Sequence, residues 1–600
     1  MTEQIKRARQ RETGIRVFLS ACGVIAVSGI IRVYGLDDVI FFNKGAVSLG
    51  FFFLCFFMLP AVYRHWKEER RDFFIGYAMA LGLVFTEILG TGMRLEVVRG
   101  GVRLTLSGVL VLAMASLIPA LLAEPFFHRL IRFSFGSSSK GREVSPDRAF
   151  LIWWGLLSAW YLLCALAFYP GLYCYDMGWQ WSQFVGWNFT THHPLLHTLF
   201  GGGLIELGRI ILGSYNRGLF FHSLVQLLFM SASMAFALRF LVKRKTHPAA
   251  VRLAGGFFLL FPFFPVLGIS TTKDTMFGIF FLVVFVCICD MVEERRFYRG
   301  RRLAAFMAAA VIMCLFRNNA VYGLGILTCC LLLVWLIRVM AHRGGSGVLL
   351  RAALLSVTCM VLSCGLFAAL EKGLHADKGG REEMMSLPMQ QMARSYVYHQ
   401  EEFSPENREE FLRFFDESWV MRYKYYVSDP VKAGMRMENF ELVPFLRLWM
   451  KLGMQFPGEY LKSPLYNMMG LWYMGGDSSC YMEYSMSSPI DEVRAVETVS
   501  KLPFLKDYYS WFTDEHLQKY LPGISVFFYT SFYSWCVILA AGVLLAKRKY
   551  LQLLLPLFLV SYSFTLIFGP CMIVRYFMGV MLCIPVLAAA TFEDDKTNKR

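Results

Sequence analysis

Residues 169–196 carry the side-chain types that a catalytic loop needs. The segment reads YPGLYCYDMGWQWSQFVGWNFTTHHPLL and directly follows the apolar run 150–168. Asp176 is the only acid in it, and a carboxylate at the boundary between membrane and water can act as a general base. The alternative is a carboxylate that caps the following helix or pairs with a cation. We predict Asp176 as the catalytic residue.

Two adjacent histidines, His192 and His193, lie in the same loop. They can orient Asp176, contact an acceptor or bind a metal, whereas the simpler alternative is a pair of ordinary loop histidines. Neighbouring residues do not point to one side of a helix. One acid is a thin ligand set for a divalent metal. We therefore predict no definite cofactor and leave a divalent metal open.

Cationic side chains stand in three other polar turns between apolar runs. Charges near a membrane-spanning segment are costly and usually serve a function, and arginine suits bidentate contact with phosphate. Snorkelling to lipid headgroups, or pairing with a nearby acid, is the alternative. The turns supply the predicted substrate-binding residues Lys273, Asp274, Arg317, Asn318, Arg575 and Tyr576.

A further cation, Arg394, follows Gln390 and Gln391 by about one helical turn. This spacing allows the three side chains to reach a binding pocket from a separate domain. An ordinary amphipathic helix explains the same pattern. Five aromatic side chains suit either stacking on sugars or an interfacial aromatic belt: Trp179, Trp181, Trp187, Trp472 and Tyr473.

Composition identifies the elements that must position these residues as membrane helices. The chain has 600 residues, of which 56% are hydrophobic and 17% are charged. In a typical soluble protein, about a quarter of the residues are charged. A helix needs about 20 apolar residues to cross the hydrocarbon of a bilayer, and many such runs are present. We expect an all-α polytopic membrane protein.

Fourteen apolar runs are long enough to be counted as spans. They are 17–35, 45–62, 73–92, 104–123, 150–168, 217–242, 250–270, 274–292, 303–316, 320–338, 349–370, 521–545, 550–569 and 572–590. Placing both chain termini in the cytoplasm puts nearly all clusters of Lys and Arg on that side, as the positive-inside rule requires. The polar turns named above then face outward.

The same rule decides two ambiguous runs. Counting 195–212 as a span would move Lys243 and its basic neighbours outside, so we predict an amphipathic helix on the outer face. The run 303–336 has basic residues at both ends and must therefore cross twice, with its turn at Arg317.

The net charge of +16 is unevenly distributed, which argues against nucleic-acid binding. Residues 371–520 hold 17 Lys and Arg against 23 Asp and Glu, and the remaining excess lies in short loops. We expect this segment to form a mainly α-helical extracytoplasmic domain. The predicted division is 1–148, an N-terminal four-helix region; 149–370, a catalytic membrane core; 371–520, the outer domain; and 521–600, a C-terminal three-helix region.

The order of these motifs resembles the GT-C superfamily of membrane glycosyltransferases, and within it the protein O-mannosyltransferase and lipid A aminoarabinose transferase branch. The residues that carry the resemblance are Asp176, His193-Pro194-Leu195, Thr271-Thr272-Lys273-Asp274, Arg317-Asn318-Asn319 and Arg575-Tyr576. The chain departs from the family at Met177, where the mannosyltransferases have Glu, and has only one proline in the second motif. The resemblance covers 150–340 well and 521–590 weakly.

The resemblance implies a GT-C-like bundle whose active site faces the outside of a bacterial-type plasma membrane. It implies a polyprenyl-phosphate sugar donor and a glycan, lipid or protein acceptor in the cell envelope. Asp176 would be the base, and Lys273, Arg317 and Arg575 would hold the phosphate. Two alternatives stay open: a lipid or glycan transporter or flippase without bond chemistry, which predicts charges near the membrane midplane, and a non-catalytic envelope assembly protein.

Overall fold

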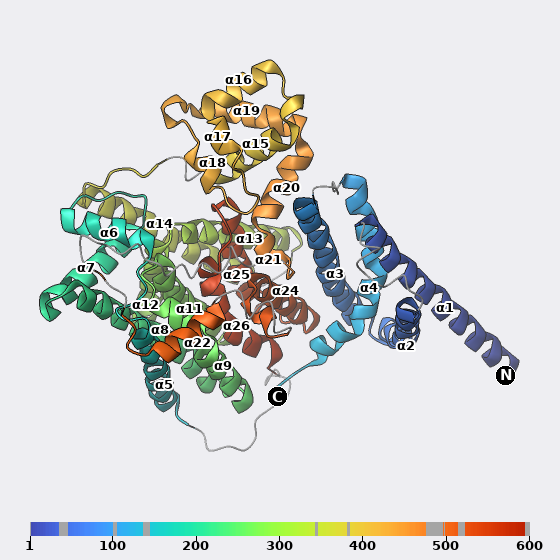
Figure 1. The fold of residues 1–600 in the computed structure, drawn as a ribbon. Helices are drawn as coiled ribbons and strands as arrows, with labels where there is room; N and C mark the ends of the chain where they lie inside the picture. Colours follow the sequence, from blue (N-terminus) through green and yellow to red (C-terminus); the bar gives the residue numbers. More distant parts are fainter. Residues whose placement is uncertain are drawn as a thin grey trace. The chain divides into compact units, whose positions relative to one another are not determined.

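A computed structural model describes residues 2–34, 46–99, 105–135, 144–342, 346–380, 385–475, 496, 499–513 and 523–593. These residues are almost entirely helical (Figure 1). No strand occurs among them, and the extended segments meet only at isolated bridges such as Leu172 with Ser270. The described part of the chain is therefore all-α.

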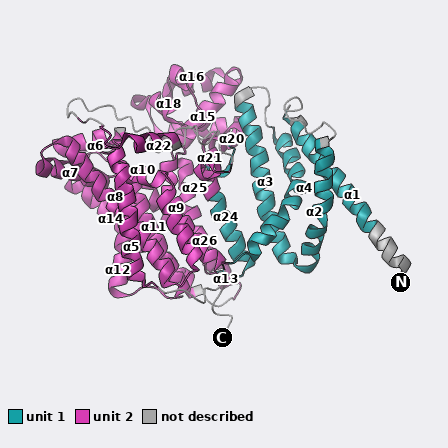
Figure 2. Ribbon diagram, turned by 60° about the horizontal axis from the view of Figure 1, so that its bottom comes forward, with its two compact units in different colours: residues 1–134, 471–477, 534–550 teal, residues 135–470, 478–533, 551–600 magenta. Residues whose placement is uncertain are grey.

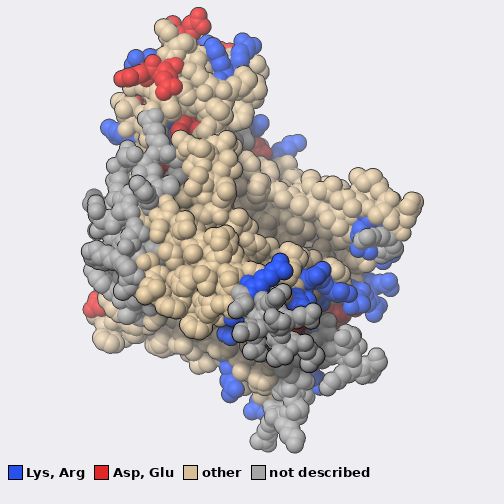
Figure 3. All heavy atoms as spheres, turned by 90° about the vertical axis from the view of Figure 1, so that its right-hand side faces the viewer, with Lys and Arg blue, Asp and Glu red and all other residues tan. Residues whose placement is uncertain are grey.

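Eleven of the described helices are long and apolar enough to cross a membrane. They are α1 (Thr2–Val33), α2 (Ala46–Glu68), α3 (Arg70–Arg99), α4 (Leu106–Arg132), α5 (Pro146–Ala167), α7 (Leu195–Leu212), α8 (Tyr215–Lys243), α11 (Lys273–Glu293), α13 (Asn319–Met340), α14 (Ser346–Gly373) and α26 (Val574–Phe592). A broad part of the face drawn in Figure 3 carries neither acidic nor basic side chains. The protein is an integral membrane protein.

Ten of the fourteen predicted spans are among these eleven helices. The other four correspond to shorter helices, α9 (Pro248–Leu260), α12 (Gly300–Phe316), α24 (Thr530–Ala546) and α25 (Leu554–Thr565). The eleventh long helix is α7, whose bounds match the predicted amphipathic helix. The count of fourteen spans and the position of α7 on the outer face remain predictions.

Two predicted spans are wrong as single helices. In 521–545, the 3-10 helix η6 (Ser525–Phe528) and the extended residue Tyr529 come before α24 begins at Thr530. The other is 250–270. The chain leaves α9 at Leu260 and resumes in the short helix α10 (Phe263–Gly268). Pro262 lacks a backbone N–H, and Phe261 before it adopts an extended conformation with φ −73° and ψ 113°. By contrast, the predicted turn at Arg317 is confirmed, since α12 ends at Phe316 and α13 begins at Asn319.

The first of two compact units contains residues 1–134, 471–477 and 534–550 (Figure 2). It contains α1 to α4 and most of α24. A Cβ on Gly542 would lie 2.2 Å from Met79 Sδ, so a larger residue in α24 would require the Met79 side chain of α3 to move. The Trp535 indole N–H donates to the Trp472 carbonyl at 3.0 Å.

The second unit contains residues 135–470, 478–533 and 551–600. At its centre lie α11 and α26. In each helix, 78% of the residues in the most apolar 18-residue stretch are buried. Phe277 and Phe281 of α11 pack against Tyr562 of α25 at ring distances of 4.9 and 5.1 Å. These buried helices fix the positions of the polar residues at their ends.

A small helical domain within the second unit is built from residues 386–467. Its helices are α15 (Ser386–His399), α16 (Pro405–Phe414), α17 (Glu417–Val420), α18 (Asp429–Ala433), α19 (Leu442–Gln455) and α20 (Pro457–Asn467). Its core includes Phe411, Phe445 and Leu448, all fully buried. Figure 3 shows charges of both signs on its surface. These helices agree with the mainly α-helical character predicted for residues 371–520.

Candidate active site

Two polar segments that are far apart in the sequence are paired where α6 (Tyr175–Gly186) and α11 begin. The Leu172 N–H donates to the Ile269 carbonyl at 3.1 Å, and the Thr271 N–H donates to the Leu172 carbonyl at 2.9 Å. The buried side chain of Gln226 in α8 donates to the Ser270 carbonyl at 2.7 Å. This backbone pairing places the first turns of α6 and α11 next to each other.

Asp176 and Lys273 meet across this pairing. The Lys273 Nζ lies 3.8 Å from the Asp176 Oδ2, and each side chain is 22% exposed. Lys273 is the first residue of α11, and Asp176 lies in the first turn of α6. At the start of α6 no side chain caps the helix. The cation-paired alternative for Asp176 is therefore present in the structure, and the partial exposure leaves both groups open to a ligand.

His193 is buried beside Lys273, whereas His192 is exposed. The His193 Nδ1 lies 3.4 Å from the Lys273 Nζ. An ammonium group can only donate, so Nδ1 accepts and the ring proton is on Nε2. Burial, together with the Lys273 ammonium, lowers the pKa of His193 to about 4. His193 is therefore a neutral imidazole at pH 7.

A second, buried layer of charge begins at Asp274, the residue after Lys273 in α11. Asp274 is 1% exposed and pairs with Arg317, and its Oδ2 lies 3.6 Å from the Arg575 Nε. The Arg317 guanidinium also lies over the Tyr576 ring, 4.2 Å from its centroid. Asn318 is exposed at the start of α13.

The two layers bring cationic donors together. Among the described residues, Lys273, Arg317 and Arg575 pair with the two carboxylates of Asp176 and Asp274. The Arg317 Nε is buried and has no hydrogen-bond partner among the described residues. Clustered cationic donors of this kind are suited to bind an anion.

Arg394 is the predicted site residue that the structure does not bring to this cluster. It is 1% exposed within the small domain, where its Nε lies 2.7 Å from the Glu459 carboxylate. Its guanidinium lies over the ring of Tyr466 at 4.5 Å. Gln391 donates to the Tyr460 carbonyl at 2.9 Å. Arg394 therefore holds α15 against α20, as expected for the alternative of a packed helix.

A model of the family DUF6020, described as a family of unknown function, matches residues 181–600. The chain belongs to DUF6020. The match includes His193, Lys273, Asp274, Arg317 and Arg575, and it begins five residues after Asp176. No curated protein matches the chain. No solved structure matches it either.

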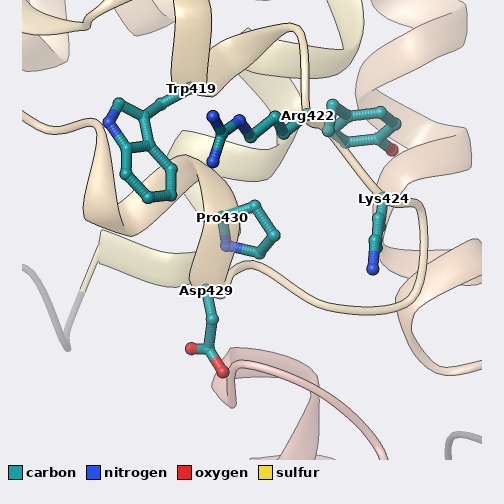
Figure 4. A pocket seen from close by; sticks show the side chains of 6 residues that line it. Trp419, Arg422, Lys424, Asp429 and Pro430 are labelled. Carbon is teal, nitrogen blue, oxygen red and sulfur yellow. The ribbon is translucent and has the colours of Figure 1, made fainter.

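This DUF6020 member also has a pocket in the small domain that the sequence did not reveal (Figure 4). Its volume is about 640 Å³, and it is lined by Trp419, Arg422, Tyr423, Lys424, Asp429 and Pro430. The Arg422 guanidinium lies 4.5 Å from the centre of the Trp419 ring. The neighbouring Ser428 N–H donates to the Pro570 carbonyl at 2.8 Å, which links the pocket to the turn that precedes Arg575.

Proposed function

We propose that the protein is a GT-C-type glycosyltransferase that moves a sugar from a polyprenyl-phosphate donor to a cell-envelope acceptor. The observation that supports this most is the ion pair of Asp176 and Lys273, which is joined through α11 to the buried cluster of Asp274, Arg317 and Arg575. The proposal includes fourteen membrane helices, cytoplasmic termini and an active site on the outer face of a bacterial-type plasma membrane.

In the proposed reaction an acceptor hydroxyl gives its proton to the Asp176 carboxylate. The acceptor oxygen then forms a bond to the anomeric carbon of the sugar. The bond from that carbon to the phosphate oxygen breaks, and its electron pair remains on the leaving polyprenyl phosphate. A carboxylate can accept this proton as a general base, and general bases of this kind contribute about 10²–10⁴-fold to a rate.

In this proposal the cations bind the phosphate and stabilise its charge. A leaving phosphate gains negative charge, and fixed cations stabilise that charge in the transition state. Lys273 is partly exposed and would contact the phosphate first, which releases Asp176 from its ion pair to accept a proton. Arg317 and Arg575 are held in place by Asp274, so they provide a positive field that needs no rearrangement. No step of the proposal requires a metal ion.

The test compares Asp176→Asn with the wild type in full-length protein purified in detergent. The substrates are a series of polyprenyl-phosphate hexoses, with solubilised envelope glycan and lipid as acceptors. We expect the wild type to release polyprenyl phosphate and the variant to be at least about 100-fold slower. Asp147→Asn is the matched control because Asp147 is exposed and pairs only with Arg239 among the described contacts.

Two results would contradict the proposal. Unchanged turnover in Asp176→Asn would exclude the base role. Donors that all stay intact with the wild type, but cross the bilayer when the protein is reconstituted in vesicles, would favour the transporter or flippase instead.

A further inference from the structure

Three side chains with metal-ligating atoms meet in the first unit, within the part of the chain that the structure describes. His65 lies in the last turn of α2, and Glu124 and His128 lie one helical turn apart on the same face of α4. Their ligand atoms all lie within 4.8 Å of one another. None of the three belongs to the proposed glycosyltransferase site.

The position of Glu69 determines which nitrogen of His128 is free to bind a metal. The His128 Nε2 lies 3.0 Å from the Glu69 carboxylate, which itself pairs with Arg132. A carboxylate accepts but does not donate, so it favours the ring proton on Nε2. The lone pair of His128 is then on Nδ1, which points to the other side of the ring.

That lone pair faces another one. The His128 Nδ1 lies 3.4 Å from the Glu124 Oε1, and both atoms are buried without a hydrogen-bond partner among the described residues. The Glu124 side chain is completely buried. Two buried acceptors in contact are unfavourable unless a proton or a metal ion lies between them.

His65 completes the arrangement from a different helix. Its Nδ1 lies 3.0 Å from the second oxygen of Glu124, and its ring stacks on that of His128 with centroids 3.7 Å apart and 7° between the planes. The Nδ1 atoms of both imidazoles therefore lie at the same carboxylate, and a bound metal ion would replace the proton that His65 Nδ1 donates to Glu124.

We propose that His65, Glu124 and His128 bind a Zn²⁺-like transition metal ion, with water as a fourth ligand and Glu69 orienting His128. Two imidazoles and a carboxylate are a ligand set that zinc uses, at about 2.0–2.2 Å from each donor atom. A metal-bound histidine commonly presents its other ring nitrogen to a carboxylate, which is the place of Glu69 here. The ion would join the ends of α2 and α4.

The test measures zinc in full-length protein purified in detergent, incubated with ZnCl₂ and dialysed. We expect about one Zn²⁺ per chain by elemental analysis in the wild type. The expected zinc content falls at least tenfold in Glu124→Gln and in His65→Asn. His342→Asn is the matched control because His342 is exposed and lies outside the cluster, and it should keep the full zinc content.

A second measurement, made on the wild type, tests the proposal even if the variants fail to fold. Zinc binding to the folded wild type must raise its unfolding temperature, and the chelator EDTA must reverse that increase. A wild type without stoichiometric zinc, or without this temperature shift, overturns the proposal. Folded Glu124→Gln protein with wild-type zinc content also overturns it.

Discussion

The His193 Nδ1 lies 3.4 Å from the Lys273 ammonium, so the imidazole accepts from the same group that pairs with Asp176. Lys273 is thus held between a neutral and a negative acceptor. This places its charge at a fixed point between the loop before α7 and the start of α6. The arrangement has a measurable consequence because His193 cannot be protonated without placing two cations in contact.

We predict that acid destabilises the protein through His193. Burial and Lys273 lower the pKa of this side chain to about 4 in the folded state, whereas an unfolded histidine titrates near 6.5. The unfolded chain therefore binds the proton first as the pH falls. The contribution of neutral His193 to the free energy of unfolding is therefore complete above pH 6.5. It decreases by at most about 3 kcal/mol as the pH falls from 6.5 to 4.

The measurement is thermal unfolding in detergent at pH 7.5, 5.5 and 4 for the wild type and for His193→Gln. Glutamine can still accept from Lys273 but does not titrate. The variant should lose less stability than the wild type over this range. Equal losses in both proteins would show that other groups cause the acid sensitivity.

We predict that the buried pair of Arg317 and Asp274 is strongly coupled. Arg317→Met leaves Asp274 with only Arg575 as its charged partner among the described residues, and removing one member of a buried pair costs about 3–5 kcal/mol. The double variant Arg317→Met/Asp274→Leu should be destabilised by less than the sum of the two single variants.

The control for this cycle is the exposed pair of Arg413 and Glu441, whose side chains are 50% and 61% exposed. Its coupling should not exceed about 1 kcal/mol. Denaturant unfolding of the four proteins in each cycle gives both values. Additive effects at Arg317 and Asp274 would mean that the two side chains act independently.

The sequence could predict features that depend on local pattern. Apolar length and the distribution of Lys and Arg placed a turn at Arg317, and the end of one amphipathic run placed α7 at residues 195–212. The break at Pro262 was also readable, because proline and the residue before it disfavour a helix. The apolar run continues without interruption on both sides of Pro262, so hydrophobicity alone predicts one helix there.

Contacts between distant segments could not be predicted in this way. Arg394 pairs with Glu459, a residue 65 positions away on another helix. No periodicity in the sequence indicates that pairing. The meeting of His65 with Glu124 depends on how α2 and α4 pack, and lipid-facing helices give few sequence signals of their neighbours. For the same reason, the sequence could list the cations around Asp176 but not their order in two layers.

Trp181 and Trp179 offer a final prediction because they lie two residues apart on α6 in opposite environments. Trp181 is fully buried, and its indole N–H donates to the Glu206 carboxylate at 2.7 Å. Trp179 is 74% exposed. Stacking on a sugar, which the sequence allowed for both, is therefore sterically open only to Trp179.

We expect Trp181→Ala to lower the free energy of unfolding by about 3–5 kcal/mol, because a large buried ring is replaced by a cavity. Trp179→Ala should change it by no more than about 0.5 kcal/mol, as is usual for an exposed position. Unfolding in detergent measures both values. Sugar transfer is then assayed at saturating and at low donor concentration in the stable variant. A slower rate only at low donor concentration would indicate that Trp179 binds the sugar, whereas unchanged rates would assign the exposed ring to the membrane interface.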